Sequence, residues 1–214
     1  MGYRLWPLLN LVVRTPRLEL RVPNDDLLFE LAELSTGDIH PPETMPFGMP
    51  WSDVSPDERG RSTLQFNWRS RAEWKPESWN CSLVTVVGGR VVGTQGVIAA
   101  NFAATRTVTT GSWLGMEYQG QGIGKEMRAA VVHLAFAGLG AQRCESAAFH
   151  DNGASLGVSR ALGYDDNGDE IHMRRDKADR IVRLLLTRDA WEPRRRADIT
   201  IEGLEDCLEL FGAA

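Results

Sequence analysis

Three glycines and a lysine lie in the segment "EYQGQGIGKEM" at residues 117–127, directly before the apolar run "RAAVVHLAFAGLG". Glycine costs a helix roughly 1 kcal/mol relative to alanine, so three of them at the start of a helix need a reason. The first turn of a helix presents backbone N–H groups that lack intrahelical partners, and their dipoles sum to partial positive charge. We interpret this loop as an anion site in which a phosphate lies against bare backbone.

The spacing of the glycines separates three phosphate-binding motifs. The phosphate loop of NTPases requires Ser or Thr after its lysine, but a glutamate follows Lys125. The dinucleotide fingerprint matches Gly120 and Gly122, but Lys125 occupies the place of its third glycine. The pattern Gln/Arg-x-x-Gly-x-Gly/Ala is satisfied by Gln119, Gly122 and Gly124. A protein that binds ATP or NAD through this loop is therefore the less favoured alternative.

Helix and strand signals around the loop predict one mixed α/β domain with an antiparallel first half and a strand–helix–strand unit in the second. Asn24 and Ser55 are expected to cap helices, and Gly88–Gly89 to turn an antiparallel hairpin. The expected strands are 18–22, 80–87, 90–102, 105–116, 141–151, 169–175 and 179–191. The expected helices are 24–35, 55–74, 122–138, 152–163 and 201–212.

Composition restricts the class of protein. The 214 residues are 43% hydrophobic and 25% charged, the ordinary globular balance, and the net charge of −5 argues against a nucleic-acid partner. The longest apolar runs are shorter than the roughly 18 residues of a membrane helix, so no membrane partner is expected. Cys81, Cys144 and Cys207 are far apart and odd in number, which predicts neither disulfides nor a metal site and favours the cytoplasm.

The run "WLGMEYQGQGIGKEMRAAVVHLAF", followed by "HDNGASLGVSRALGY", resembles the acyl-CoA-binding core of the GCN5-related N-acetyltransferase (GNAT) superfamily. The segments "TPRLELR", "MPFGMPW" and "LLLTRDAW" resemble the RimJ/RimL branch of ribosomal-protein N-terminal acetyltransferases. The resemblance implies a GNAT fold of the α+β kind, with a mostly antiparallel twisted sheet that splays at a parallel pair and is flanked by helices. It predicts a single domain over 1–214, with its core at about 14–191 and a C-terminal helical extension at 197–212.

The resemblance also implies which residues hold the co-substrate, acetyl-CoA or another acyl-CoA. Leu114 and Met116 would pair with the pantetheine amides, Asn152 would bond the pantetheine arm, and Ser155 would lie near the CoA sulfur. Backbone amides of the loop would hold the pyrophosphate, and these belong to Gln119, Gly120, Gln121, Gly122, Ile123, Gly124 and Lys125.

For the chemistry, Ser155 is the first candidate for the acid that protonates the departing thiolate, with Ser159 or a water as the alternative. Many family members have a tyrosine further along this helix, where this chain has Ser159. Glu117 and His150 are candidates for the general base, and a backbone N–H near Met116 for the oxyanion. No metal is expected.

The loop "GDIHPPETMPFGMPWSDVSPDE" is predicted to act as a lid or substrate rim, or else as a packed connection. Its candidate contacts to the acceptor are His40, Met45, Phe47 and Trp51. The acceptor amine stays open between a small molecule and a protein or peptide. The acyl group also stays open, because the resemblance is not confined to acetyl-CoA. An acetyl group is the simplest case. A succinyl group would need a cation near the thioester end, and the sequence does not identify one.

Two further hypotheses concern assembly and catalysis. The apolar run "IVRLLL" beside a sheet edge, together with the expected terminal helix, predicts a homodimer or another homo-oligomer. The missing tyrosine keeps a non-catalytic acyl-CoA sensor as an alternative to an N-acyltransferase.

Overall fold

A nine-stranded sheet organises the chain in the computed structural model, which describes residues 3–214. The strands lie in the order β7-β8-β6-β5-β4-β3-β2-β1-β9, and every neighbouring pair is antiparallel except β5 and β6. This confirms the predicted fold class. The strands are β1 (Val12–Arg14), β2 (Glu19–Arg21), β3 (Ser78–Val87), β4 (Arg90–Ala100), β5 (Thr107–Leu114), β6 (Arg143–Phe149), β7 (Asp165–Arg174), β8 (Lys177–Thr187) and β9 (Thr200–Glu202).

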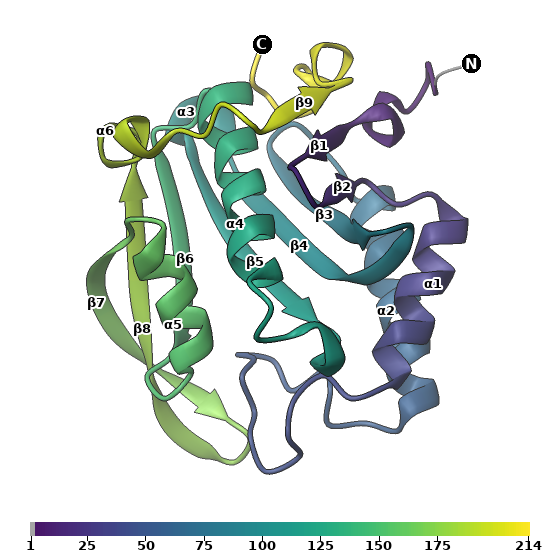
Figure 1. Ribbon diagram of the computed structural model, residues 1–214, viewed down its shortest axis with the longest axis vertical. Helices are drawn as coiled ribbons and strands as arrows, with labels where there is room; N and C mark the ends of the chain where they lie inside the picture. Colours follow the sequence, from purple (N-terminus) through teal and green to yellow (C-terminus); the bar gives the residue numbers. More distant parts are fainter. Residues whose placement is uncertain (1–2) are drawn as a thin grey trace.

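Helices cover both faces of the sheet (Figure 1). Side chains alternate between the faces along β3, so Leu83 joins the core beneath α4 and α5, whereas Val84 packs with Leu28 and Leu31 of α1. The helices are α1 (Asp25–Thr36), α2 (Pro56–Ala72), α3 (Phe102–Thr105), α4 (Ile123–His133), α5 (Gly153–Ala161) and α6 (Arg188–Trp191). None of the helices formed by residues 3–214 combines the length and hydropathy needed to cross a bilayer.

The predicted helix starts of α1 and α2 are confirmed by their caps. The side chain of Asn24 accepts a hydrogen bond of 3.0 Å from the N–H of Leu27. Ser55 and Glu58 form a reciprocal capping box, with Pro56 in the first turn. The loop between these helices lies below the N-terminal end of α4 and beside the tip of the β7–β8 hairpin (Figure 1).

The parallel pair opens partway along its length. Thr107–Thr109 of β5 pair with Arg143–Glu145 of β6, and the two strands share no pairing beyond that point. The rest of β5 stays paired to β4 up to Leu114, and the rest of β6 stays paired to β8 up to Phe149. The two halves of the sheet therefore diverge, which confirms the predicted splay and leaves backbone edges unpaired inside it.

The predicted C-terminal helical extension at 197–212 is wrong. Thr200–Glu202 form strand β9, which pairs with β1, and Glu205–Cys207 form only a 3₁₀ turn. Gly203 explains the difference, because its φ of +70° breaks a helix and a Cβ there would lie 2.4 Å from the carbonyl oxygen of Asn10. The regularly spaced apolar side chains of this segment pack into the core from a turn and not from a helix.

The apolar run on which the homodimer prediction rests is not at a sheet edge. The run "IVRLLL" belongs to β8, which lies between β7 and β6, so the edges of the sheet are β7 and β9. The strand predicted to reach residue 191 ends at Thr187, whose side chain accepts from the N–H of Ala190 and starts α6.

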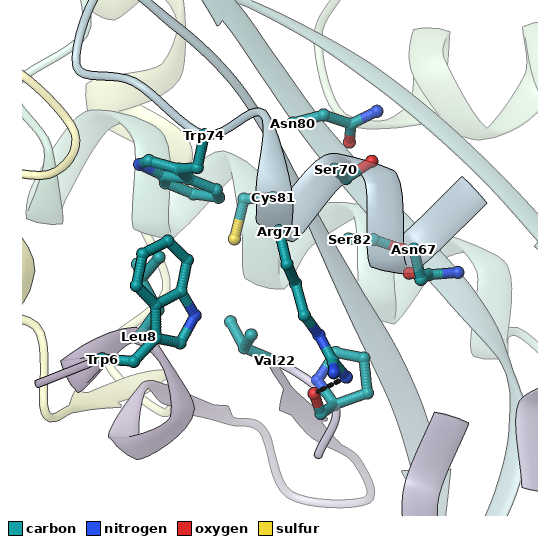
Figure 2. A pocket seen from close by; sticks show the side chains of 11 residues that line it. Trp6, Leu8, Val22, Asn67, Ser70, Arg71, Trp74, Asn80, Cys81 and Ser82 are labelled. Carbon is teal, nitrogen blue, oxygen red and sulfur yellow. Dashed lines mark hydrogen bonds between the residues drawn. The ribbon is translucent and has the colours of Figure 1, made fainter. Parts of the chain in front are cut away.

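A small cavity lies beneath α2, between β3 and the N-terminal segment (Figure 2). Trp6 and Trp74 meet edge to face beside it, with ring centroids 6.2 Å apart, and Arg71 donates to the carbonyl of Pro23 at 2.6 Å. Its volume of about 20 Å³ holds roughly one water molecule. This cavity is therefore a packing gap, too small for a substrate.

Candidate functional site

A second cavity, of about 770 Å³, occupies the splay between β5 and β6. The glycine loop, the start of α5 and the loop between α1 and α2 close its other sides. Most of the predicted binding residues line this cavity, namely Leu114, Gln119, Gly120, Gly122, Gly124, Lys125, Asn152, Ser155, His40 and Phe47. The structure thus brings together residues from three separate segments of the sequence, 40–47, 114–125 and 152–155.

The glycine loop presents a row of unused backbone donors. Gly120 and Gly122 have φ of +72° and +78°, a conformation that glycine adopts without strain. The first helical hydrogen bond runs from the N–H of Glu126 to the carbonyl of Gly122 at 3.1 Å. Across the described residues, the six N–H groups of 120–125 donate to no protein acceptor. They form the concave set of donors that a phosphate requires.

Gln119 supports the loop with its side chain. Its amide nitrogen donates to the carbonyl of Ile39 at 2.7 Å and to that of Leu114 at 3.0 Å. Its own N–H donates to the carbonyl of Met116 at 3.2 Å. The structure therefore gives Gln119 a positioning role, because its N–H is not free for a phosphate.

Met116 does not fit the role predicted for it. Its N–H donates to the carbonyl of Asp38 at 2.8 Å, so this group is not free for an oxyanion or for pantetheine. Its side chain is exposed outside the cavity, at the start of a 3₁₀ turn that ends β5. Leu114, two residues earlier, does line the cavity.

The start of α5 places Asn152 and Ser155 together on the cavity wall. The side-chain oxygen of Asn152 caps the helix by accepting from the N–H of Ser155 at 3.0 Å. The hydroxyl of Ser155 makes no hydrogen bond to the described residues and stays available. Ser159, the alternative candidate, is fully buried and lies off the cavity wall.

His150 and Glu117, the predicted general bases, are not brought to the cavity. The Nε2 of His150 lies 3.1 Å from a carboxylate oxygen of Asp179, on the exposed turn after β6. Glu117 is exposed in the 3₁₀ turn before the loop. Of the acids and histidines among residues 3–214, Asp151 and His40 line the cavity.

Aromatic side chains form one rim of the cavity. His40, Phe47, Trp51 and Trp113 follow one another with ring centroids 5.6, 5.1 and 5.6 Å apart. Of these, His40, Phe47 and Trp113 line the cavity, and Trp51 supports them from outside. Met45, also predicted to contact the acceptor, is buried in the loop beneath them and does not line the cavity.

Two consecutive arginines at the tip of the β7–β8 hairpin attach this loop to the sheet. Arg174 donates to the carbonyl of Met45 at 2.8 Å and pairs with Asp151 at 2.8 Å. Arg175 pairs with Asp53 at 2.7 Å and donates to the carbonyl of Pro42 at 2.9 Å. The rim of the cavity is therefore held in place by the far edge of the sheet.

Arg128 of α4 is a cavity residue that the sequence did not reveal. Its guanidinium is buried and donates to Gln95, Ser112 and Ser146 at 3.0–3.2 Å. The one available signal was a charged residue at the start of the apolar run "MRAAVVHLAF", which amphipathic spacing alone assigns to neither face.

The three cysteines are buried and lie away from the cavity. Burial raises the pKa of the Cys144 thiol to about 11, and none of the three cysteines lines the cavity. Residues 3–214 contain no cluster of His, Cys, Asp and Glu side chains with the arrangement of a metal site.

A family model described as "Acetyltransferase (GNAT) domain" matches residues 17–165. Three solved structures are similar in fold. A ribosomal-protein-S5-alanine acetyltransferase from Vibrio fischeri has 17% identity and a TM-score of 0.61, over 85% of this chain and 99% of that one. RimL, a ribosomal L7/L12 alpha-N-protein acetyltransferase in complex with coenzyme A, has 17% identity and a TM-score of 0.65, over 84% of this chain and 99% of that one. A GNAT-family acetyltransferase from Bacillus anthracis has 13% identity and a TM-score of 0.64, over 83% of this chain and 99% of that one.

Proposed function

Because the chain belongs to the GNAT acetyltransferase family, we propose that it transfers an acyl group from acyl-CoA to a primary amine. The observation that carries this proposal is the row of six unused N–H groups at residues 120–125, which opens into the 770 Å³ cavity. A pyrophosphate is the anion that such a row accommodates. The RimL structure, which has the same fold, holds coenzyme A.

The splay suggests the path of the pantetheine arm. Beyond Thr109, the edge of β5 that faces β6 is unpaired. Asn152 and Ser155 line the same cavity as this edge. An extended arm with two amides can add to such an edge as a strand would. The arm would run from the glycine loop toward the point where β5 and β6 meet, and the thioester would lie near that point.

The reaction follows by direct attack in a ternary complex. The neutral amine attacks the thioester carbon, the C–S bond breaks, and the proton lost by the amine balances the one gained by the thiolate. We assign to Ser155, whose hydroxyl has no hydrogen bond to the described residues, the donation of that proton to the sulfur. Both ring nitrogens of His40 have partners, Pro41 at 2.9 Å and Ser52 at 2.7 Å, and the Asp151 carboxylate is paired with Arg174, so a water is the better acceptor for the proton of the ammonium.

The acceptor enters from the aromatic rim. Asp151 is the carboxylate on the wall at that side, and a carboxylate attracts an ammonium group. RimL and the S5-alanine enzyme are acetyltransferases of ribosomal proteins by name. We extend to this chain the broader class, a primary amine on a protein, a peptide or a small molecule.

Calorimetric titration with acetyl-CoA and with free CoA tests binding, and release of the CoA thiol tests transfer. The amines for the second assay are a peptide with a free N-terminus, a lysine peptide and spermidine. Micromolar binding with thiol release that requires an amine supports the proposal. Binding without release by any amine favours the acyl-CoA sensor, and no binding contradicts both.

A further inference from the structure

Arg128 is a buried cation without a counter-charge. The residue is 4% exposed, and none of the ion pairs among residues 3–214 includes it. Its partners are neutral: Gln95 at 3.2 Å, Ser112 at 3.2 Å, Ser146 at 3.0 Å and Ser159 at 3.5 Å. Burial of a guanidinium costs several kcal/mol unless an anion compensates it.

Two other charged side chains near the cavity are compensated. Glu126, on the same helix, pairs with Arg17 at 2.6 Å. Arg174, with a side chain 15% exposed, pairs with both Asp151 and Asp179 at 2.8 Å. Arg128 is therefore the exception in its own surroundings.

The position of Arg128 relates it to the acyl end of the donor. Ser112 of β5 and Ser146 of β6 lie just past the last pair that joins these strands, Thr109 with Glu145. The guanidinium thus bridges the two strands at the closed end of the splay. Arg128 also follows Ile123, the first residue of α4, by five residues, about 7.5 Å along the helix. It therefore lies deeper than the phosphate loop, on the side toward which the pantetheine arm runs.

The donors around Arg128 are not all used. Ser112, which lines the cavity with Arg128, accepts from the guanidinium, and its hydroxyl donates to no acceptor among the described residues. One N–H of the Nη2 group also lacks an acceptor. Buried donors without acceptors are costly, so this cluster is built for a negatively charged oxygen.

We infer that Arg128 binds a carboxylate at the end of the acyl chain, so that the preferred donor is the CoA monothioester of a dicarboxylic acid. This inference rests on the proposed function. Acetyl-CoA brings no charge to this end of the cavity, whereas a succinyl group would compensate the guanidinium. The carboxylate takes no part in the bond changes and is carried unchanged onto the amine, so the product is an amide that ends in a carboxylate.

The test compares succinyl-CoA with butyryl-CoA, which has a four-carbon chain but ends in a methyl group. Wild-type protein is titrated with both ligands and with free CoA. We expect succinyl-CoA to bind at least tenfold more tightly than butyryl-CoA. Arg128→Gln is expected to reduce this ratio to about one and to leave the affinity for free CoA within threefold.

Arg188→Gln is the matched control. Arg188 also donates to neutral oxygens, the carbonyls of Phe136 and Ala141, but it does not line the cavity. Its substitution is expected to leave the succinyl-to-butyryl ratio unchanged. Circular dichroism melts of both variants establish that they fold.

Equal affinity of the wild type for succinyl-CoA and butyryl-CoA overturns the inference and leaves the proposed function intact. A preference for succinyl-CoA that survives in folded Arg128→Gln also overturns it. If Arg128→Gln does not fold, the wild-type ratio decides. A free-CoA affinity that rises above pH 8 and depends on Arg128, without an acyl preference, would show that Arg128 serves the thiolate instead. Failure to bind any CoA compound removes both proposals.

Discussion

The guanidinium of Arg17 lies 2.6 Å from the carboxylate of Glu126, and it joins the segment before β2 to the first turns of α4. Thr15 donates to the same carboxylate, and a second nitrogen of Arg17 reaches the carbonyl of Gln121 at 3.2 Å. The glycine loop is therefore held from outside by a segment about a hundred residues earlier. Because Arg17 fixes the carbonyl of Gln121, the N–H groups of the loop stay turned toward the cavity.

Arg17→Ala is expected to weaken CoA binding roughly tenfold, because a charge-assisted hydrogen bond that orients the loop is lost. The half-exposed guanidinium also places positive charge beside the phosphate site. Titration calorimetry with free CoA measures the change. Arg21→Ala, which removes a comparable pair with Glu19 on β2, is the control and should bind CoA as the wild type does. An unchanged affinity in Arg17→Ala would contradict the role given to this pair.

The stability contributed by Glu126 is expected to depend on pH. Burial raises the pKa of the Glu126 carboxyl, but hydrogen bonds from Thr15 and Arg17 outweigh burial and hold the pKa below its ordinary value of 4.5. A lowered carboxyl pKa gives stability that is present above pH 4.5 and is lost as the pH falls through the folded-state pKa.

Urea unfolding of wild type and Glu126→Gln between pH 7 and pH 3 checks this expectation. The difference in unfolding free energy between them should be constant above about pH 5.5 and shrink below pH 4.5. Glu33→Gln, on the exposed face of α1, is the control and should follow the wild-type curve in parallel. A difference that grows in acid would mean that the sign of the Glu126 contribution is wrong.

Gly122→Ala is expected to weaken CoA binding at least tenfold while destabilising the fold by only about 1 kcal/mol. A Cβ at this position would lie 3.5 Å from the Nη2 of Arg17, and the φ of +78° is strained for alanine, so the row of N–H donors would shift. Gly89→Ala is a closely matched control, because Gly89 has a φ of +80° in the β3–β4 turn and nothing within 4 Å of its Cβ position. If both variants bind CoA equally well, the glycine loop does not hold the pyrophosphate.

Local signals predicted the parts of the site that local structure determines. The glycine loop was predictable because a strand–loop–helix motif fixes its own geometry, and the resemblance to the GNAT core pointed to Asn152 and Ser155, which line the cavity. The positions of Glu117 and His150 close to the loop and to α5 in sequence were misleading, since the backbone turns them away from the cavity. Sequence proximity does not give side-chain direction.

Residues whose role depends on distant partners were not predictable. Arg128 became identifiable only when β4, β5, β6 and α5 brought neutral acceptors around it. The C-terminal segment has helical apolar spacing, but pairing of β9 with β1 and the close approach of Gly203 to Asn10 overrode that local preference.

Arg175→Ala is expected to loosen the loop between α1 and α2. The side chain of Arg175 joins Asp53 and the carbonyls of Pro42 and Thr44 to the β7–β8 hairpin, and its φ of +51° is equally strained in alanine. The KM for the amine should rise several-fold, and proteolysis within 38–54 should be faster, while CoA affinity stays unchanged. Arg183→Ala, which removes a bond to Asn167 elsewhere on the same hairpin, should alter neither measurement.

Ser155→Ala is expected to lower kcat about tenfold at pH 7 and to have little effect on the Kd for CoA. The Ser155 hydroxyl lines the cavity without a protein partner, and we assign it the proton that the departing thiolate takes up. A thiol with a pKa near 8.5 leaves without a proton at high pH, so the ratio of wild-type to variant kcat should approach one above about pH 9. Ser159→Ala, which alters a buried acceptor of Arg128, should not show this convergence. A kcat ratio that is independent of pH would argue that Ser155 only orients the pantetheine arm, and a ratio of one throughout would leave the thiolate to a water.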